Sequence, residues 1–149
     1  MLVYELENVT LEVLEAFQRL IPQLTKYSQP PTPDALISMV ESPNTMIFIA
    51  RYPDNDGEIV GTAALATFET PTGVHGWIED VVVDRNMRHM GIGKALTEAC
   101  IKKAREIGLR EINLSSNPGR EAANRLYQSM GFVRRITNVY RYPLNEGDE

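Results

Sequence analysis

The sequence predicts an α/β (α+β) fold in which helices flank a mixed, mostly antiparallel central sheet of six to seven strands. Apolar strand-like segments alternate along the chain with amphipathic helical segments, which is typical of layered α/β architectures. A strand that runs into a long helix and then a further strand predicts one parallel crossover in this sheet. The chain has 149 residues, the length of one domain with a single core.

The N-terminal segment predicts a first strand followed by a helix. Residues 2–6 have the composition of a strand. Thr10 is a good N-cap for a helix that continues to about residue 24. The apolar residues that recur at helical spacing and form its expected buried face are Leu11, Leu14, Phe17, Ile21 and Leu24.

A second helix and a pair of strands come next. Thr32 and Pro33, a cap followed by proline at the first helical position, begin a short helix that ends near residue 41. Strands at 45–51 and 58–69 are joined by a turn rich in Pro, Asp, Asn and Gly, which is the chemistry of a hairpin.

The C-terminal half predicts the remaining elements. A third long strand spans 76–83, and the helix that follows it spans 91–108. A short strand at 111–115 and a helix at 118–130 come after it. Two final strands within 132–144 complete the predicted sheet.

Composition and charge exclude several classes of protein. The net charge of −5 comes without a dense lysine or arginine cluster, so nucleic acid is not an expected partner, and an amine is a better match to an acidic surface. No apolar run approaches the ~20 residues of a membrane span, and the N-terminus lacks signal-peptide features. Cys100 is the single cysteine, which excludes an internal disulfide and favours the cytoplasm.

The segment 80–96 has the features of a phosphate-binding turn. An apolar strand passes through a polar turn to Gly91 and Gly93 at the start of a long helix, where backbone N–H groups lack partners and the helix dipole is positive. The glycines omit the Cβ atoms that would hold a diphosphate away, and Arg88 and Lys94 add positive charge. The alternative is a pair of glycines that only permits a tight connection. The spacing excludes the dinucleotide fingerprint and the P-loop.

A second informative segment spans 121–132. It ends a helix with Leu126 and Tyr127, followed by Gly131 as a natural residue after a helix end. Taken alone, Tyr127 is a core residue. Taken together, Arg-x-x-Gly-x-Gly after a strand and Leu-Tyr-x-x-x-Gly-Phe further along resemble the GNAT superfamily of acetyl-CoA-dependent N-acetyltransferases. The resemblance covers residues 77–132 closely and the rest in pattern only.

The resemblance implies that the first motif binds the diphosphate of coenzyme A. The residues that would contact it are Arg88, His89, Met90, Gly91, Ile92, Gly93 and Lys94. His89 is a departure, because glycine most often follows the arginine in this family. The tyrosine of the second motif typically lies near the thioester sulfur, so Tyr127 would be the general acid for the departing thiolate.

The resemblance also implies contacts with the pantetheine arm of coenzyme A. Main-chain groups of the strand formed by Val81, Val82 and Val83 would hydrogen-bond this arm. Asn117 either reaches the cofactor from the neighbouring strand end or caps the helix that begins at Pro118. Asn124, one helical turn before Tyr127, is a second candidate contact.

Acetyl transfer to an amine requires a general base, because an ammonium group cannot attack a thioester. Glu79 and Asp80 interrupt an apolar strand, where burial would raise the pKa of a carboxyl group. Neighbouring strand residues point to opposite faces unless a bulge intervenes, and the family commonly has one here. Glu79 is the predicted base, and Asp80 is an acceptor contact or the alternative base. The competing interpretation is an ion pair with an arginine of a neighbouring element.

The resulting prediction is a single N-acetyltransferase domain over 1–149. It comprises acceptor-side loops in 1–76, an acetyl-CoA-binding core at 77–132, C-terminal strands at 133–144 and an acidic tail at 145–149. It would move an acetyl group from acetyl-CoA to a primary amine of a small molecule by direct attack in a ternary complex. No metal is expected, because the two histidines have no third ligand beside them.

Three alternatives stay open. Segments 79–83 and 138–141 are similar to glucosamine-6-phosphate N-acetyltransferases, which favours an amino-sugar phosphate acceptor. A peptide or protein amine is the second alternative, and a noncatalytic acyl-CoA-binding module is the third. The resemblance is also compatible with a homodimer, since dimers are common in the superfamily.

Overall fold

The computed structural model describes residues 1–145, and the predicted acidic tail lies, from residue 146 onward, outside the described residues. The chain forms two compact units, Met1–Ser115 and the residues from Ser116 onward. Every strand among the described residues lies in the first unit, together with α1, α2 and α3, and the second unit contains α4. The single-domain organisation stays a prediction.

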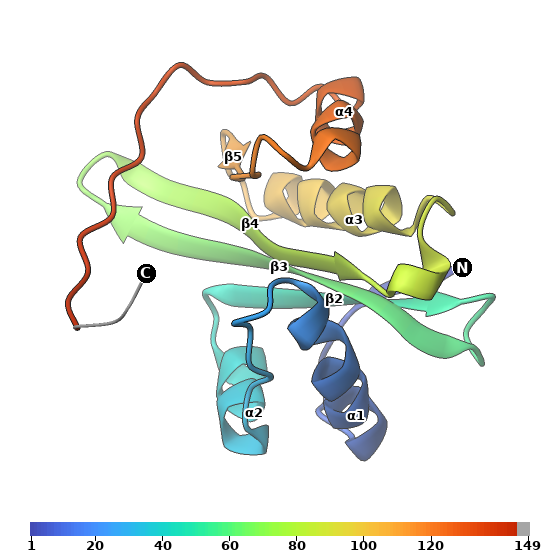
Figure 1. Ribbon diagram of the computed structural model, residues 1–149. Helices are drawn as coiled ribbons and strands as arrows, with labels where there is room; N and C mark the ends of the chain where they lie inside the picture. Colours follow the sequence, from blue (N-terminus) through green and yellow to red (C-terminus); the bar gives the residue numbers. More distant parts are fainter. Residues whose placement is uncertain (146–149) are drawn as a thin grey trace. The chain divides into compact units, whose positions relative to one another are not determined.

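A five-stranded sheet runs through the first unit in the order β1, β2, β3, β4, β5 (Figure 1). Its strands are β1 (Leu2–Glu5), β2 (Thr45–Tyr52), β3 (Glu58–Thr70), β4 (Gly73–Val83) and β5 (Ile112–Asn113). The first four strands pair antiparallel, and β5 joins β4 in parallel. Because α3 (Ile92–Glu106) connects these two parallel strands, the predicted mixed sheet and its crossover are confirmed.

Helices cover both faces of this sheet (Figure 1). The helices α1 (Leu11–Leu20) and α2 (Pro33–Glu41) lie on one face, and α3 lies on the other. A Cβ atom on Gly61 of β3 would lie 3.0 Å from Cδ1 of Leu96 in α3, so this glycine permits close packing of α3 on the sheet. Cys100 of α3 is fully buried, and burial raises the pKa of its thiol to about 12.

Both predicted N-caps in the first unit are confirmed. The hydroxyl of Thr10 accepts a hydrogen bond from the backbone N–H of Val13 at 3.3 Å. The hydroxyl of Thr32 accepts one from the backbone N–H of Ala35 at 3.2 Å. In each case the threonine satisfies an amide that the first helical turn leaves without a partner.

The buried face of α1 matches the predicted one in part, because Phe17 is buried and Leu14, Ile21 and Leu24 are half-buried against the same core cluster. Its buried residues are Val13, Ala16, Phe17 and Leu20. Leu11 is 71% exposed, because it lies in the first turn outside the stripe that the helical repeat places against the sheet. The α-helix also ends earlier, since Pro22 cannot donate the backbone hydrogen bond of a further turn and the chain continues as a 3-10 helix (Ile21–Gln23).

The two strands predicted within 132–144 are not present. In the second unit α4 (Glu121–Ser129) is followed by Gly131, whose φ of 101° is the left-handed conformation expected after a helix end. Residues 132–145 form neither helix nor strand. A strand needs the backbone of a second strand as partner, and no ladder among residues 1–145 includes this segment. The sheet therefore has five strands rather than six or seven.

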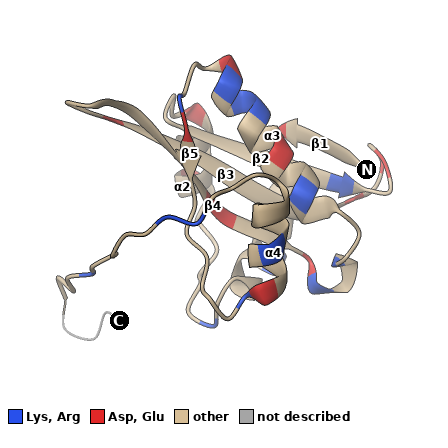
Figure 2. Cartoon of the chain, turned by 90° about the horizontal axis from the view of Figure 1, so that it is seen from above, with Lys and Arg blue, Asp and Glu red and all other residues tan. Residues whose placement is uncertain are grey.

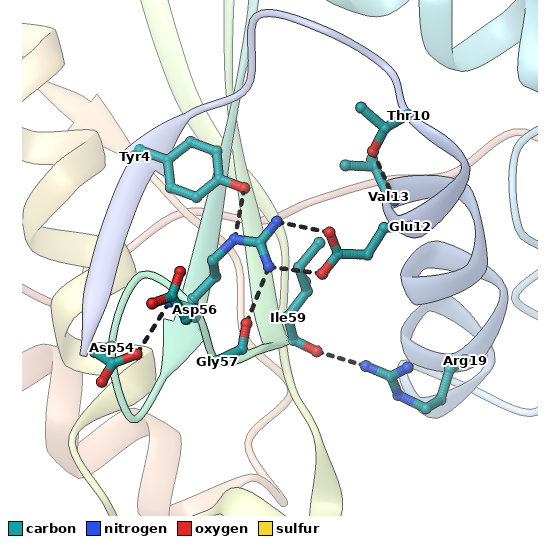
Figure 3. A network of polar contacts seen from close by, with 10 residues as sticks. Tyr4, Thr10, Glu12, Val13, Arg19, Asp54, Asp56, Gly57 and Ile59 are labelled. Atoms are coloured by element: carbon teal, nitrogen blue, oxygen red, sulfur yellow. Dashed lines mark hydrogen bonds and ion pairs between the residues drawn. The ribbon is translucent and has the colours of Figure 1, made fainter.

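Arg51 of β2 connects α1 with the sheet (Figure 3). Its guanidinium group donates to both carboxylate oxygens of Glu12, with Nη1 to Oε1 at 2.6 Å and Nη2 to Oε2 at 3.0 Å. The same side chain donates to the hydroxyl of Tyr4 at 3.2 Å and to the carbonyl of Gly57 at 2.9 Å. Because a bidentate pair also fixes orientation, one side chain joins β1, α1 and the turn between β2 and β3.

The ion pair between Glu12 and Arg51 predicts that the stability of the fold depends on pH in the acidic range. The hydrogen bond from Arg51 holds the pKa of Glu12 below its ordinary value. A carboxylate with a lowered pKa stabilises the folded state above its ordinary pKa, and this stabilisation is lost as the pH falls through the folded-state pKa. We expect Glu12→Gln to lower the Tm near neutral pH, with a difference from wild type that shrinks in acid. Thermal unfolding at a series of pH values measures it.

The matched control is Glu15→Gln, which removes an exposed carboxylate from the same helix. Its Tm should follow the wild-type curve at every pH. Parallel curves for Glu12→Gln and wild type across the acidic range would contradict the role of the pair.

Candidate functional site

An extra residue interrupts the pairing of β4 with β3. Thr62 pairs with Val82 and Ala64 pairs with Glu79, so two steps along β3 are matched by three along β4. Within this stretch Asp80 has a φ of 52°, in the left-handed region that non-glycine residues seldom occupy. This strand therefore has a bulge, a feature that is common at this place in the family that the sequence resembles.

The bulge changes which side chains share a face of the sheet. Cross-strand partners in an antiparallel pair point to the same side. Side chains at 79 and 82 would point to opposite sides of a regular strand, because they alternate. With the extra residue both point to the side of α1 and α2, where Val82 joins the buried cluster of Val13 and Leu20.

Glu79 is exposed, which corrects the expectation of a carboxylate enclosed by the sheet. The reason is its partner on β3, since Ala64 has no side-chain atom beyond Cβ to cover it. Partial desolvation of the carboxyl group, and then the negative charge of Asp80, raise the pKa of Glu79. Within residues 1–145 neither Glu79 nor Asp80 forms an ion pair, so the competing interpretation finds no arginine partner there.

Asp84 holds the loop that follows β4. Its Oδ1 accepts from the backbone N–H of Asn86 at 3.0 Å, and its Oδ2 pairs with Nε of Arg19 at 3.3 Å. Arg19 of α1 also donates to the carbonyl of Ile59 at the start of β3 (Figure 3). The sequence interpretation missed Asp84, although an aspartate between a strand and a polar turn is a signal for a side-chain cap.

The turn opens into α3 with unpaired amides. The first hydrogen bond of this helix runs from the backbone N–H of Ala95 to the carbonyl of Gly91 at 3.0 Å. The amides of Ile92, Gly93 and Lys94 precede it and have no acceptor inside the helix. They lie at the positive end of the helix dipole, so the turn has the electrostatics of an anion-binding site.

Both glycines of this turn have room for a side chain that the sequence leaves out. A Cβ on Gly91 would meet no atom within 4 Å, and a Cβ on Gly93 would meet Cγ2 of Val83 at 3.7 Å. Gly91 has a backbone reason to be glycine, because its φ is 78°. Neither packing nor backbone conformation explains Gly93. The need for a tight connection therefore explains glycine at position 91 and leaves Gly93 unexplained. A ligand that approaches the backbone amides explains glycine at both positions.

Arg88 and Lys94 bring positive charge to the same turn, and both are exposed. Lys94 lies 3.8 Å from Glu98 one helical turn later, and Arg88 has no ion-pair partner in the described part of the chain. Figure 2 shows basic and acidic residues interspersed along α3. Exposed pairs of this kind are weak, so Lys94 stays available to a ligand and adds to the positive character that the amides and Arg88 give the turn.

The edge of β4 that leads to this turn is paired with another strand over only part of its length. β5 pairs with β4 at Gly76 and Trp77 alone, so among residues 1–145 no strand pairs with that edge from 78 to 83. Val82 is buried in the core, whereas Val81 and Val83 are half-buried. An extended ligand can add to such an edge through main-chain hydrogen bonds.

The second unit contains the other predicted site residues. Oδ1 of Asn117 accepts from the backbone N–H of Gly119 at 2.8 Å, and the carbonyl of Asn117 accepts from Nδ2 of Asn124 at 3.0 Å. Asn117 is therefore not the cap of α4, because its side chain closes the turn that precedes Glu121. Tyr127 is 8% exposed, and its ring meets Phe132 edge-on with centroids 5.8 Å apart.

The structure thus brings the predicted residues together in two sets. The strand, turn and helix start from Glu79 to Lys94 form one continuous set in the first unit. Asn117, Asn124 and Tyr127 form the other set in the second unit.

Two further features concern ligands and membranes. Among residues 1–145, no three His, Cys, Asp or Glu side chains gather in a way that suits a metal ion. Over the same range, no helix combines the length and the apolar character needed to cross a membrane.

Three kinds of comparison point to one family. A model of the acetyltransferase (GNAT) family matches residues 11–132. N-alpha-acetyltransferase 30 of Saccharomyces cerevisiae is 39% identical over 75 residues, which cover 50% of this chain and 42% of the yeast protein. Mycothiol acetyltransferase of Paenarthrobacter aurescens is 36% identical over 93 residues, which cover 61% of this chain and 29% of that protein.

A crystal structure of an acetyltransferase from Trypanosoma brucei superposes with a TM-score of 0.74 at 28% identity, over 95% of this chain and 98% of that one. The match to the yeast and bacterial relatives spans less than half of their length.

The left-handed conformation of Asp80 predicts an unusual order of stability among variants at this position. A β-branched residue is disfavoured at its φ of 52°, whereas glycine adopts that conformation without a steric cost. We expect Asp80→Val to unfold more easily than Asp80→Gly, with a difference in the free energy of unfolding of about 1–2 kcal/mol. Urea denaturation of the two variants measures it.

Glu69 of β3 is the matched control, because it is exposed and lies in regular strand. At that position valine should be the more stable substitution and glycine the less stable. The same order at both positions would show that the bulge does not constrain Asp80.

Proposed function

This chain belongs to the GNAT family of acetyltransferases, and on that basis we propose that it transfers an acetyl group from acetyl-CoA to a primary amine. One observation carries the proposal: the edge of β4 that lacks a strand partner among residues 1–145 leads to the amides at the start of α3 that have no acceptor inside the helix. An extended ligand with a diphosphate matches both parts, because strand edges bind extended chains and helix N-termini bind phosphates.

In the proposed complex the main chain of Val81 to Val83 binds the pantetheine arm, and the turn from Arg88 to Lys94 binds the diphosphate. The open space at Gly91 and the room for a side chain at Gly93 support this assignment. His89 has a φ of 63°, which glycine adopts without steric cost. The family's usual glycine and this histidine are therefore compatible with the same shape of the turn. Asn117 and Asn124 stay predicted cofactor contacts.

The chemistry requires a proton acceptor near the amine. When bound, acetyl-CoA supplies an acetyl thioester, which a neutral amine can attack. Glu79 takes the proton that the amine nitrogen loses, directly or through water, and its raised pKa brings the carboxyl group closer to the working pH. Asp80, the next residue and part of the bulge, contacts the acceptor or serves as the base in place of Glu79.

Tyr127 is the proposed general acid. Its hydroxyl would donate a proton to the departing thiolate sulfur, the role that the tyrosine of this motif typically has in the family. The acetyl group passes directly from acetyl-CoA to the amine in a ternary complex, with Glu79 as the base and Tyr127 as the acid.

The acceptor is proposed as a small-molecule primary amine first and a peptide amine second. The name of the Paenarthrobacter relative, mycothiol acetyltransferase, favours a small molecule. The name of the yeast relative, N-alpha-acetyltransferase 30, favours an α-amino group. An amino-sugar phosphate acceptor, a homodimer and a cytoplasmic location stay predictions.

If the turn before α3 binds the diphosphate, a larger side chain in this turn should weaken the binding of coenzyme A. We expect Gly93→Val to weaken coenzyme A binding by about tenfold or more, a loss of about 1.4 kcal/mol, because the added side chain occupies the space over the amides. The fold should persist, since the nearest atom to a Cβ at this position is 3.7 Å away. Isothermal titration calorimetry measures the affinity.

Lys102→Ala is the control, because it removes an exposed positive charge from the same helix away from its start. Its affinity for coenzyme A should equal that of wild type. If Gly93→Val binds coenzyme A as tightly as the control, the turn is not the diphosphate site.

Glu79 as the base predicts the pH dependence of turnover. A base must be deprotonated, so the wild-type kcat should rise with pH through the raised pKa of Glu79 and then level off. We expect Glu79→Gln to lower kcat by about 10²–10⁴-fold and to lose this rising limb. Release of thiol from acetyl-CoA with a panel of amines measures the rate.

Glu69→Gln removes a remote exposed carboxylate and should leave the profile unchanged. Tyr127→Phe should lower kcat while affinity for coenzyme A is retained. Wild-type rates in both Glu79→Gln and Tyr127→Phe would remove the catalytic assignments. Binding of coenzyme A without consumption of any amine would instead identify a noncatalytic module.

A further inference from the structure

One face of the hairpin formed by β3 and β4 is open over its outer part. On β3, Ala64 and Ala66 are half-buried and Phe68 is 47% exposed, whereas Leu65 between them is fully buried. Because side chains alternate along a strand, the hairpin has one packed face and one open face in this region.

The opposite strand repeats the pattern. On β4, Glu79 is exposed and Trp77 and His75 are half-buried, whereas Ile78 is buried. The register of the two strands pairs Ala64 with Glu79, Ala66 with Trp77 and Phe68 with His75. The open face therefore carries Glu79, Trp77 and His75 in order from the bulge to the hairpin tip.

Phe68, His75 and Trp77 form an aromatic strip that continues from Glu79. The rings of Phe68 and His75 stack with their centroids 5.3 Å apart and their planes 22° apart. Nε2 of His75 lies 2.8 Å from Oγ1 of Thr70 and 3.0 Å from Oγ1 of Thr72, which holds the ring at its edge. Part of the strip is thus ordered before any ligand binds, which reduces the entropy lost on binding.

We propose that this aromatic strip selects the acceptor, so that the preferred substrate is a primary amine with an apolar group that packs on Trp77 and Phe68. The inference rests on the proposed function, because it places the amine at Glu79. The two ends of the open face differ in chemistry: the carboxylate of Glu79, next in sequence to that of Asp80, attracts an ammonium group, and the aromatic rings attract hydrocarbon.

The spacing along β4 sets the reach of this acceptor. Residues two apart in a strand are separated by about 7 Å, so an apolar group within about 7 Å of the nitrogen meets Trp77. Ala66, the partner of Trp77, and Ala64, the partner of Glu79, have no side-chain atom beyond Cβ, so they fill little of the space beside the indole ring. A hydroxylated or charged group in the same place would lose water, whereas the strip offers it mainly the carbon atoms of aromatic rings.

Trp77 is the single tryptophan of the chain, so its fluorescence reports on the strip without any need for turnover. The probes are phenethylamine and ethanolamine, which differ in the group attached to the same aminoethyl unit. We expect phenethylamine to change the emission of Trp77 saturably, with a Kd about tenfold or more below that of ethanolamine. The titration is made without and with coenzyme A.

Phe68→Ala tests the strip itself, and Val74→Ala is its matched control. Both residues are exposed and lie near the hairpin tip, but Val74 pairs with Glu69 and lies on the other face. Phe68→Ala should raise the Kd of phenethylamine about threefold or more and leave that of ethanolamine unchanged, whereas Val74→Ala should change neither. The Tm of each variant shows that the fold is retained, and His75→Ala provides a second variant of the strip.

The outcomes separate this inference from the proposed function. Equal affinity for the two amines, no response of Trp77, or equal effects of Phe68→Ala and Val74→Ala would overturn the inference. If acetyl-CoA is consumed at the same kcat/KM with both amines, the inference fails and the proposed function stands. If no amine is consumed while phenethylamine still binds in the expected pattern, the proposed function fails and the strip remains an amine-binding surface.

Discussion

The extra residue in β4 is the constraint on which the arrangement of the site depends. It moves Glu79 to the face of α1 and α2, while Val83 lies under Gly93 at the start of α3. A regular strand would place residues 79 and 83 on the same face, because they are an even number of steps apart. The bulge thus lets one strand present an acidic side chain on one side and support the anion-binding turn on the other.

The position of that turn depends on contacts from α1. Arg19 reaches both the carbonyl of Ile59 and the carboxylate of Asp84, so it ties the beginning of β3 to the end of β4. Arg51 attaches the same helix to β1 and to the turn between β2 and β3 through Glu12. Two arginines therefore hold α1 against the strands that carry the site: Arg19, which belongs to α1, and Arg51 of β2, which pairs with Glu12 of α1.

The site combines two opposite local charges within a chain of net charge −5. Carboxylates at the bulge favour a cationic acceptor, whereas the amides of Ile92, Gly93 and Lys94 favour an anion. Because β4 runs directly into the turn before α3, these two environments are ordered along a single stretch of backbone. This order suits an enzyme that brings an anionic carrier and an amine to one strand, the function proposed for this member of the GNAT family.

The amino-acid sequence by itself determined the caps at Thr10 and Thr32, the glycine turn before α3 and the position of Glu79 and Asp80 along the chain. Only the tertiary structure decided that Glu79 is exposed opposite Ala64, that Leu11 lies outside the buried stripe of α1, and that residues 132–144 pair with no strand within residues 1–145. The physical reason is the range of the interactions. A cap or a helix-opening turn is made by residues within a few positions of one another. The exposure of a side chain and the pairing of a strand depend on groups that folding brings from distant parts of the sequence.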